Sequence, residues 1–303
     1  LYRPNMRAPV GKVEVSVAAI GHRTQSKSIN LGAKGASLKF ALPLLNAKVG
    51  RQFTDRLSSL NQGPPMVVLA PGRFQMGNDS GPLSEQPAHS VVLPQPFAVS
   101  KYEITVAQFL QFVTQTKRKV DSRILKLDPQ LPVAHVTHKD AVAYTQWLSQ
   151  ESGQRYRLLT ESEWEYAARA GSSSAYSFGD DPLNMCAYAN ISDLSTKQAF
   201  RSWTVTNCDD GQVRPGIGGQ YKPNKFGLHD LYGNVAEWVQ ECGMPEYSQA
   251  SMIGSDPTLG ASCESHGYRG GSWDSTAEEA ASSYRNASSR SSDDRGIRVL
   301  REF

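Results

Sequence analysis

The sequence predicts an α+β protein with little regular secondary structure. Residues 12–17 alternate between apolar and polar side chains, and residues 66–69 form an apolar run, as expected of strands. Helical spacing of apolar residues recurs in three later stretches. Between them, long segments such as 175–223 hold mostly turn residues, and the chain contains 25 Gly and 17 Pro. Loops are therefore expected to form much of the fold.

The first sixty residues differ in charge from the rest of the chain. They hold ten Lys or Arg and two acidic residues, a net charge of +8, and because the whole chain carries +3 the remainder carries −5. Residues 61–65, Asn-Gln-Gly-Pro-Pro, are typical of a linker. We therefore predict a basic N-terminal arm or small extension, residues 1–62, and a main domain, residues 63–303. The arm is expected to fold against this domain, to mediate a homodimer, or to meet an anionic partner such as lipid headgroups.

Composition argues against several classes of protein. The sequence has no run of about eighteen apolar residues, so it predicts no transmembrane span. No nucleic-acid-binding motif accompanies the basic residues, so a nucleic-acid partner is not expected. The chain opens at Leu1 rather than at a methionine, which suggests a mature or truncated product.

The four cysteines, Cys186, Cys208, Cys242 and Cys263, fall into two pairs, each spanning about twenty turn-rich residues. No Cys-x-x-Cys occurs and the histidines do not cluster with them, which argues against a zinc site. We predict disulfides between Cys186 and Cys208 and between Cys242 and Cys263. Disulfides indicate an oxidising compartment such as the bacterial periplasm. The alternative is four buried free thiols in a cytosolic protein.

Two helices are expected in the first half of the main domain. Thr105 is a suitable N-cap for a helix whose apolar positions recur at helical spacing: Val106, Phe109, Leu110 and Val113. Residues 131–141 precede a second helix, which carries Val142, Trp147 and Leu148. Gly153 is placed to end that helix, since glycine readily takes the left-handed conformation that follows a last turn.

A third helix has the clearest local signals. Thr160 is its N-cap, and Glu163, three residues later, completes a capping box. Trp164 and Ala168 are expected to face inward, and Gly171 to stop the helix.

Several motifs in order resemble those of one family, the formylglycine-generating enzymes or sulfatase-modifying factors. They are Pro-Gly-Arg-Phe-Gln-Met-Gly at 71–77, the third-helix segment at 155–171, Arg-Gly-Gly-Ser-Trp at 269–273 and Gly-Ile-Arg at 296–298. The resemblance covers about four fifths of the chain, from residue 66 onward. It implies the irregular, C-type-lectin-like α+β fold of that family, with an opening hairpin at 71–77.

The family's reaction is expected to be missing. In active members two cysteines follow the Gly-Gly-Ser-aromatic turn and carry a copper-dependent oxidation, whereas this chain has no cysteine between Cys263 and Phe303. A serine hydroxyl cannot replace a thiolate as a ligand for Cu(I). We therefore expect no copper and no catalytic residues, and residual oxidation of sulfatase peptides is disfavoured.

The resemblance also places a substrate cleft, whose wall would include Ser272, Trp273, Ser275 and Arg285. Three alternative chemistries remain for this region of the sequence. A Ser275 nucleophile lacks a histidine placed by any motif, although His266 is the nearest in sequence. An acid/base pair of Glu278 and Glu279 would need a raised pKa. An iron site would need a histidine triad, and only His135 and His138 lie close together in the sequence.

Two structural calcium ions are implied by the resemblance. Residues 226–238 resemble the family's calcium loop, whose ligands map onto the side chains of Asp230 and Glu237 and the carbonyls of Gly233 and Val235. The second site maps onto Asn190, Asp210 and the carbonyls of Ile191 and Gln212. Calcium takes six to eight hard oxygen ligands, which alternating side chains and carbonyls supply. The alternative is ordinary surface acids, with Asn190 of Asn-Ile-Ser as a loop residue or glycosylation acceptor.

These features favour a non-catalytic periplasmic scaffold or regulator that binds a protein partner. The chain looks most like cysteine-lacking family members that act in type VI secretion upstream of a membrane kinase, so the periplasmic part of such a kinase is the expected partner. The alternative is an enzyme similar to the family member implicated in oxidising a precursor of the siderophore pyoverdine.

Overall fold

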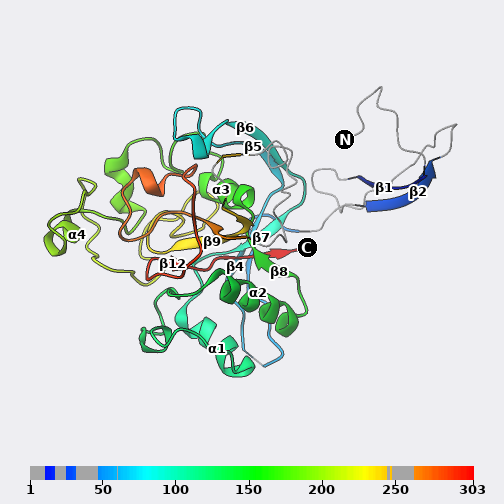
Figure 1. Cartoon of the computed structure of the whole chain (residues 1–303), viewed down its shortest axis with the longest axis horizontal. Coiled ribbons are helices and arrows are strands. Elements are labelled where there is room, and N and C mark those ends of the chain that lie inside the picture. Colours follow the sequence, from blue (N-terminus) through cyan, green and yellow to red (C-terminus); the bar gives the residue numbers. More distant parts are fainter. Residues whose placement is uncertain (1–10, 18–24, 32–46, 60, 244–245, 248–262) are drawn as a thin grey trace.

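The computed structural model describes residues 11–17, 25–31, 47–59, 61–243, 246–247 and 263–303 (Figure 1). The helices in these residues are α1 (Val106–Thr116), α2 (His138–Ser152), α3 (Glu161–Arg169) and α4 (Leu194–Ala199). The strands are β1 (Gly11–Val17), β2 (Gln25–Leu31), β3 (Gln52–Phe53), β4 (Met66–Leu69), β5 (Gly72–Met76), β6 (His89–Leu93), β7 (Phe97–Ser100), β8 (Tyr156–Leu158), β9 (Ala236–Cys242), β10 (His266–Arg269), β11 (Asn286–Ser288), β12 (Arg295–Gly296) and β13 (Val299–Glu302).

A five-stranded sheet in the order β3-β4-β7-β13-β8 separates two hydrophobic cores. Successive residues of a strand point to opposite faces of a sheet. In β4, Met66 and Val68 therefore join the core that contains α1 and α2, whereas Val67 and Leu69 join the core that contains α3. Because both faces are buried, β4 is a continuous apolar run, as the sequence predicts.

Helices α1, α2 and α3 each begin with a capping box, and the N-caps of α1 and α3 are those expected from the sequence. Thr105, Thr137 and Thr160 each accept a hydrogen bond from the backbone three residues later. Two helix ends differ from the prediction. α2 begins at His138 rather than after Ala141, because Thr137 and Asp140 form its capping box. In α3 the left-handed residue that ends the helix is Ala170, with φ 46°, one residue before Gly171.

A second sheet, in the order β11-β10-β9-β12, carries the predicted functional segments. β9 starts at Ala236, inside the predicted calcium loop, and β12 runs parallel to it with Gly296 opposite Glu237. β10 ends at Arg269, so the Gly-Gly-Ser-Trp turn leaves the sheet next to the calcium loop. The expected opening hairpin is confirmed as β5 paired with β6.

Both predicted disulfides are present. Cys186 is bonded to Cys208 and Cys242 to Cys263, with Cα atoms 5.9 and 5.5 Å apart, and the chain has no free cysteine. The alternative of four free thiols is therefore wrong. The first disulfide ties the segment before α4 to the turn-rich loop after it, where regular hydrogen bonding is sparse.

The N-terminal part of the chain contributes a hairpin and one strand of the main sheet. β1 pairs with β2 in antiparallel fashion, which agrees with the strand expected at 12–17. β3 precedes the predicted boundary at residue 62 and pairs with β4 beyond it. The division into arm and domain stays a prediction. Among the described residues no helix is long and apolar enough to cross a membrane.

His138, the first residue of α2, packs against the second sheet rather than beside His135. Its ring stacks on that of His266 in β10 with centroids 3.6 Å apart, and its Nε2 lies 2.8 Å from the carbonyl oxygen of Val239. Burial, and then the neighbouring His266, lower the pKa of His138 to about 4. The folded state therefore favours the neutral ring.

Loss of the disulfide between Cys186 and Cys208 is expected to destabilise the fold. Closing a loop of this length restricts the unfolded chain, so the double serine variant should lose about 3 kcal/mol of unfolding free energy. Urea unfolding of the variant and the wild type measures the difference. An equal unfolding midpoint for the two proteins would contradict the expectation.

Acid should destabilise the protein through His138. The pKa of His138 in the folded protein lies below its ordinary value of about 6.5, so the unfolded chain takes up a proton more readily. The stability that this residue contributes above about pH 6.5 is therefore lost as the pH falls towards the folded-state pKa. We expect this residue to account for a loss on the order of 3 kcal/mol. Urea unfolding at neutral pH and near the folded pKa, for wild type and His138→Gln, measures it. The same acid sensitivity in both proteins would refute the assignment.

Candidate metal centre and groove

Three buried carboxylates surround one buried guanidinium at the start of β9. The carboxylates are Glu103, Asp230 and Glu237, each at most 3% exposed, and Arg298 is fully buried. Glu237 Oε1 accepts from Arg298 Nε at 2.6 Å, and Glu237 Oε2 accepts from Trp164 Nε1 at 2.6 Å. The remaining donors of the guanidinium reach the carbonyls of Ser100, His229 and Asp230.

This cluster carries an excess of negative charge that suits a divalent cation. Burial raises the pKa of Glu103, Asp230 and Glu237, and the charges of the other two acids raise that of Glu103 further. With all three acids ionised, a net charge of −2 remains after Arg298 is counted. Each Glu237 oxygen already accepts one hydrogen bond. A cation would therefore have to bind the remaining lone pair of one of these oxygens. The predicted ligands Asp230 and Glu237 thus lie in one buried acidic cluster, in which Glu237 is already bonded to Arg298 and Trp164.

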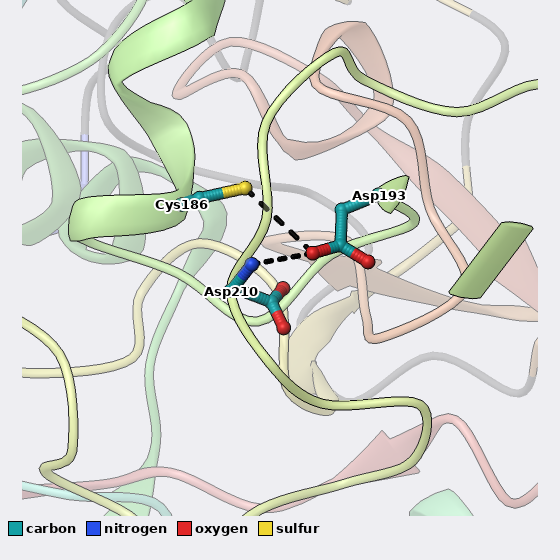
Figure 2. A group of neighbouring side chains, drawn as sticks. All are labelled: Cys186, Asp193 and Asp210. Carbon is teal, nitrogen blue, oxygen red and sulfur yellow. Dashed lines mark hydrogen bonds between the residues drawn. The ribbon is translucent and has the colours of Figure 1, made fainter. Parts of the chain in front are cut away.

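A second acidic cluster lies beside the disulfide of Cys186 (Figure 2). Asp193 Oδ2 accepts from the backbone N–H of Asp210 at 2.5 Å and lies 3.9 Å from Cys186 Sγ. In the part of the chain that the structure describes, Cys186, Asp193 and Asp210 form the one group of three or more His, Cys, Asp or Glu residues whose ligand atoms lie close enough together to hold one metal ion. Because Cys186 Sγ is bonded to Cys208, the two carboxylates are the available ligands.

The residues predicted for the second calcium site gather around Asp210. Its carboxylate accepts from the backbone N–H of Ile191 at 2.8 Å and of Gln212 at 2.7 Å. Burial raises the pKa of Asp210 to about 7, and Asp193 adds to the effect. Asn190 is buried, and its Oδ1 has no hydrogen-bond partner. A buried amide oxygen without a hydrogen-bond partner is suited to bind a cation, so these residues fit the predicted site.

The burial of Asn190 also decides one alternative. At 1% exposure its side chain is not accessible in the folded protein, so the glycosylation alternative does not apply.

Asn190 forms a parallel bridge with Gly233 of the other site. A Cβ on Gly233 would lie 1.9 Å from the Asn190 carbonyl oxygen, so glycine is required for this approach. The two predicted sites are therefore adjacent.

A groove lies beside the turn that follows β10. One hollow of about 210 Å³ is lined by Ser272 and Ser275, and a second of about 450 Å³ is lined by Arg285. Tyr284 and Asn286 line both hollows, so the two adjoin each other. Three of the four predicted cleft residues thus meet at the groove. The fourth, Trp273, is buried and packs against Trp203, Phe200 and Arg214.

The chemistry of the smaller hollow is acidic and hydroxylic. Asp274, Glu279 and Asp294 line it, and burial raises the pKa of Asp274. Ser272 Oγ donates to Asp274 Oδ1 at 2.5 Å, and Ser275 Oγ accepts from the backbone N–H of Ser272 at 3.0 Å. All four cysteines are in disulfides, so no thiol reaches this groove. The lining can bind cationic and hydrogen-bonding groups, but it offers no soft metal ligand.

The alternative catalytic groups are dispersed. The ring of His266 stacks on His138, neither histidine lines either hollow, and the backbone N–H of His135 donates to the Ser292 carbonyl. Glu279 lines the smaller hollow and accepts from the backbone N–H of Thr276, whereas Glu278 is exposed and lines neither hollow.

Three contributors to these sites were missed from the sequence: Glu103, Asp193 and Arg298. Glu103 stands between β7 and α1, where an acid among apolar neighbours is a weak sign of a buried partner. Asp193 precedes Thr196 by three residues and caps α4, a signal that was available. Arg298 belongs to the Gly-Ile-Arg motif, but nothing local indicates its partner, which lies 61 residues away in Glu237.

Comparison with known proteins agrees with this geometry. The family described as sulfatase-modifying factor enzyme 1-like domain matches residues 54–303. The solved structure of PvdO from Pseudomonas aeruginosa superposes with a TM-score of 0.72 and 30% identity, covering 85% of this chain and all of PvdO. The inactive C-alpha-formylglycine-generating enzyme 2 of Mus musculus is 26% identical over 272 residues, covering 73% of this chain and 78% of the relative.

Another relative has a different overall organisation. The serine/threonine-protein kinase pkn1 of Chlamydia pneumoniae is 27% identical over 243 residues, covering 73% of this chain but 35% of the kinase. The chain thus spans about a third of that relative's length. Since the family match extends over most of the chain and the fold agrees with it, the chain belongs to the sulfatase-modifying factor, or formylglycine-generating enzyme, family.

Proposed function

We propose that the chain is a non-catalytic scaffold or regulator that binds a protein partner through the groove beside Ser275. The observation that carries the proposal is the lining of this groove. Where active relatives have two cysteines after the Gly-Gly-Ser-aromatic turn, this chain presents Ser275 and the carboxylates of Asp274 and Glu279. Such groups recognise a ligand but do not bind Cu(I) or transfer electrons.

The proposed partner is the periplasmic part of a membrane kinase in type VI secretion signalling. Two disulfides support an oxidising compartment such as the periplasm. The likeness to a named kinase, pkn1, supports a kinase-associated context. The likeness to a relative named as inactive supports a role without the family's oxidation. Among such proteins the sequence looks most like TagR, the periplasmic regulator of type VI secretion.

Two structural calcium ions are part of the proposal. One is held by the side chains of Asp230 and Glu237 with the carbonyls of Gly233 and Val235. The other is held by Asn190 and Asp210 with the carbonyls of Ile191 and Gln212. Support comes from the net charge of the first cluster and from the unpartnered Asn190 Oδ1 in the second. Calcium supplies charge neutralisation there, and the protein oxygens hold the surrounding loops in place.

A second candidate function is oxidation of a pyoverdine precursor. It is favoured by the 30% identity with PvdO, whose whole structure is covered. Turnover of the siderophore precursor, followed by its absorbance, separates the two candidates. A change of absorbance that depends on the protein would favour the enzyme, and binding without turnover would favour the scaffold.

The groove makes a prediction about binding. Glu279→Gln removes a carboxylate from the smaller hollow and should weaken binding of the purified periplasmic region of the organism's type VI secretion kinase about tenfold, because a charge-assisted hydrogen bond is lost. Glu278→Gln is the matched control, since the adjacent acid is exposed and does not line the hollow. Calorimetric titration measures both. Equal weakening by the two variants, or no binding by the wild type, would count against the proposal.

Calcium should raise the thermal stability of the chain. At a concentration about a thousandfold above its Kd, one ion contributes about 4 kcal/mol, which corresponds to a rise of about 10 °C in Tm. The measurement is thermal unfolding in excess chelator and then in excess CaCl2. Asp210→Asn should reduce the rise, whereas Asp121→Asn, which removes an acid paired with Arg123 elsewhere, should not. A Tm indifferent to chelation would sink the calcium proposal.

A further inference from the structure

We propose that Asn234 links the two candidate cation sites to each other and to the groove turn, residues 272–275, so that binding of a divalent cation orders this turn. An effect of this link on partner binding rests on the proposed function. The link between cation and turn itself is measurable without any partner.

The side chain of Asn234 joins the two sites directly. It is buried, and its Oδ1 accepts from Asn190 Nδ2 at 3.2 Å and from the backbone N–H of Gly216 at 2.8 Å. Its Nδ2 donates to Glu103 Oε2 at 2.6 Å. Asn190 belongs to the site around Asp210, and Glu103 to the acidic cluster around Asp230. One amide therefore bridges a predicted ligand of one site and an acid of the other.

The backbone of Asn234 contacts both Asn190 and the groove turn. Its N–H donates to the Asn190 carbonyl at 2.7 Å, and its carbonyl accepts from the N–H of Trp273 at 3.0 Å. The Ser275 carbonyl accepts from the N–H of Ser192 at 2.9 Å, directly after the predicted ligand Ile191. Both ends of the groove turn are thus bonded to segments that carry cation ligands.

This arrangement converts cation binding into order at the groove. A cation on Asn190 Oδ1 would add a further contact to an amide whose Nδ2 already donates to Asn234 Oδ1 and to the Arg214 carbonyl, and would thereby strengthen the hold on Asn234. Mutation of a residue that orients a metal ligand typically lowers metal affinity by about 10- to 100-fold. Because linkage is reciprocal, whatever orders Asn234 and the turn also tightens the cation sites. The backbone of Asn234 is left-handed, with φ 59°, which places its side chain and its carbonyl where both contacts form.

Asn234→Gly is the direct test. Glycine tolerates the positive φ and keeps the backbone hydrogen bonds, so the variant removes only the bridging amide. Calcium titration by calorimetry should show affinity reduced at least tenfold. Hydrogen exchange of the peptide covering residues 270–276 should show calcium-dependent protection in the wild type that is largely lost in the variant.

The matched control is Lys117→Gly. Lys117 is exposed and also left-handed, with φ 52°, at the end of α1 far from both sites in the chain. It should leave calcium affinity and protection of residues 270–276 unchanged. If Asn234→Gly behaves like this control, the inference is overturned. It is also overturned if the wild type binds calcium without any change of exchange in the groove turn.

A second variant keeps the test decisive if Asn234→Gly does not fold. Asn190→Ala removes the unpartnered Oδ1 and the bond to Asn234, and no contact of its side chain with the groove turn is involved. It should abolish calcium-dependent protection of residues 270–276, whereas full protection would refute the link. Failure of the kinase region to bind would count against the proposed function while leaving this result intact, so the two failures are distinguishable.

Discussion

The buried ion pair between Glu237 and Arg298 is the interaction on which the site depends. Both side chains are almost fully buried, and the guanidinium also reaches the carbonyls of Ser100 and Asp230. The ion pair therefore connects the end of β7, the predicted calcium loop and the segment before β13 to the start of β9. Removing one partner of such a pair leaves an uncompensated buried charge, which costs about 3–5 kcal/mol. Regular hydrogen-bond ladders are short here, so this pair takes over part of their role.

The same logic explains why the loops beyond the sheets can be both irregular and specific. A loop with no ladder must satisfy its backbone groups in other ways. Here carboxylates and amides do so: Asp210 accepts from two backbone N–H groups, and Glu103 accepts from Val235 N–H. Each acid used in this way adds buried negative charge. The excess of buried negative charge thus arises from how the loops are held, and the disulfide between Cys186 and Cys208 restrains the same region without adding charge.

How much of this could be predicted from the sequence follows from the range of each interaction. The capped helices and the buried strand β4 depend on residues within a few positions of one another, so Thr160 with Glu163 was readable directly. The disulfide pairing was readable because each pair is close in sequence. The roles of Glu103 and Asn234 were not, because their contact joins residues 131 positions apart. The stacking of His138 on His266 was missed for the same reason, and proximity in sequence suggested His135 instead.

The geometry of the groove turn shows which of its contacts depend on the side chain at position 275. The turn is fixed by main-chain groups: the N–H of Trp273, the carbonyl of Ser275 and the N–H of Ser272, which donates to Ser275 Oγ. The first two contacts form whatever side chain stands at position 275, and a hydroxyl satisfies the third. The main-chain contacts of the turn therefore form with serine at this position, and a serine hydroxyl is not a ligand for Cu(I). The surface left behind is preformed and polar, and a preformed surface binds a partner with less ordering cost.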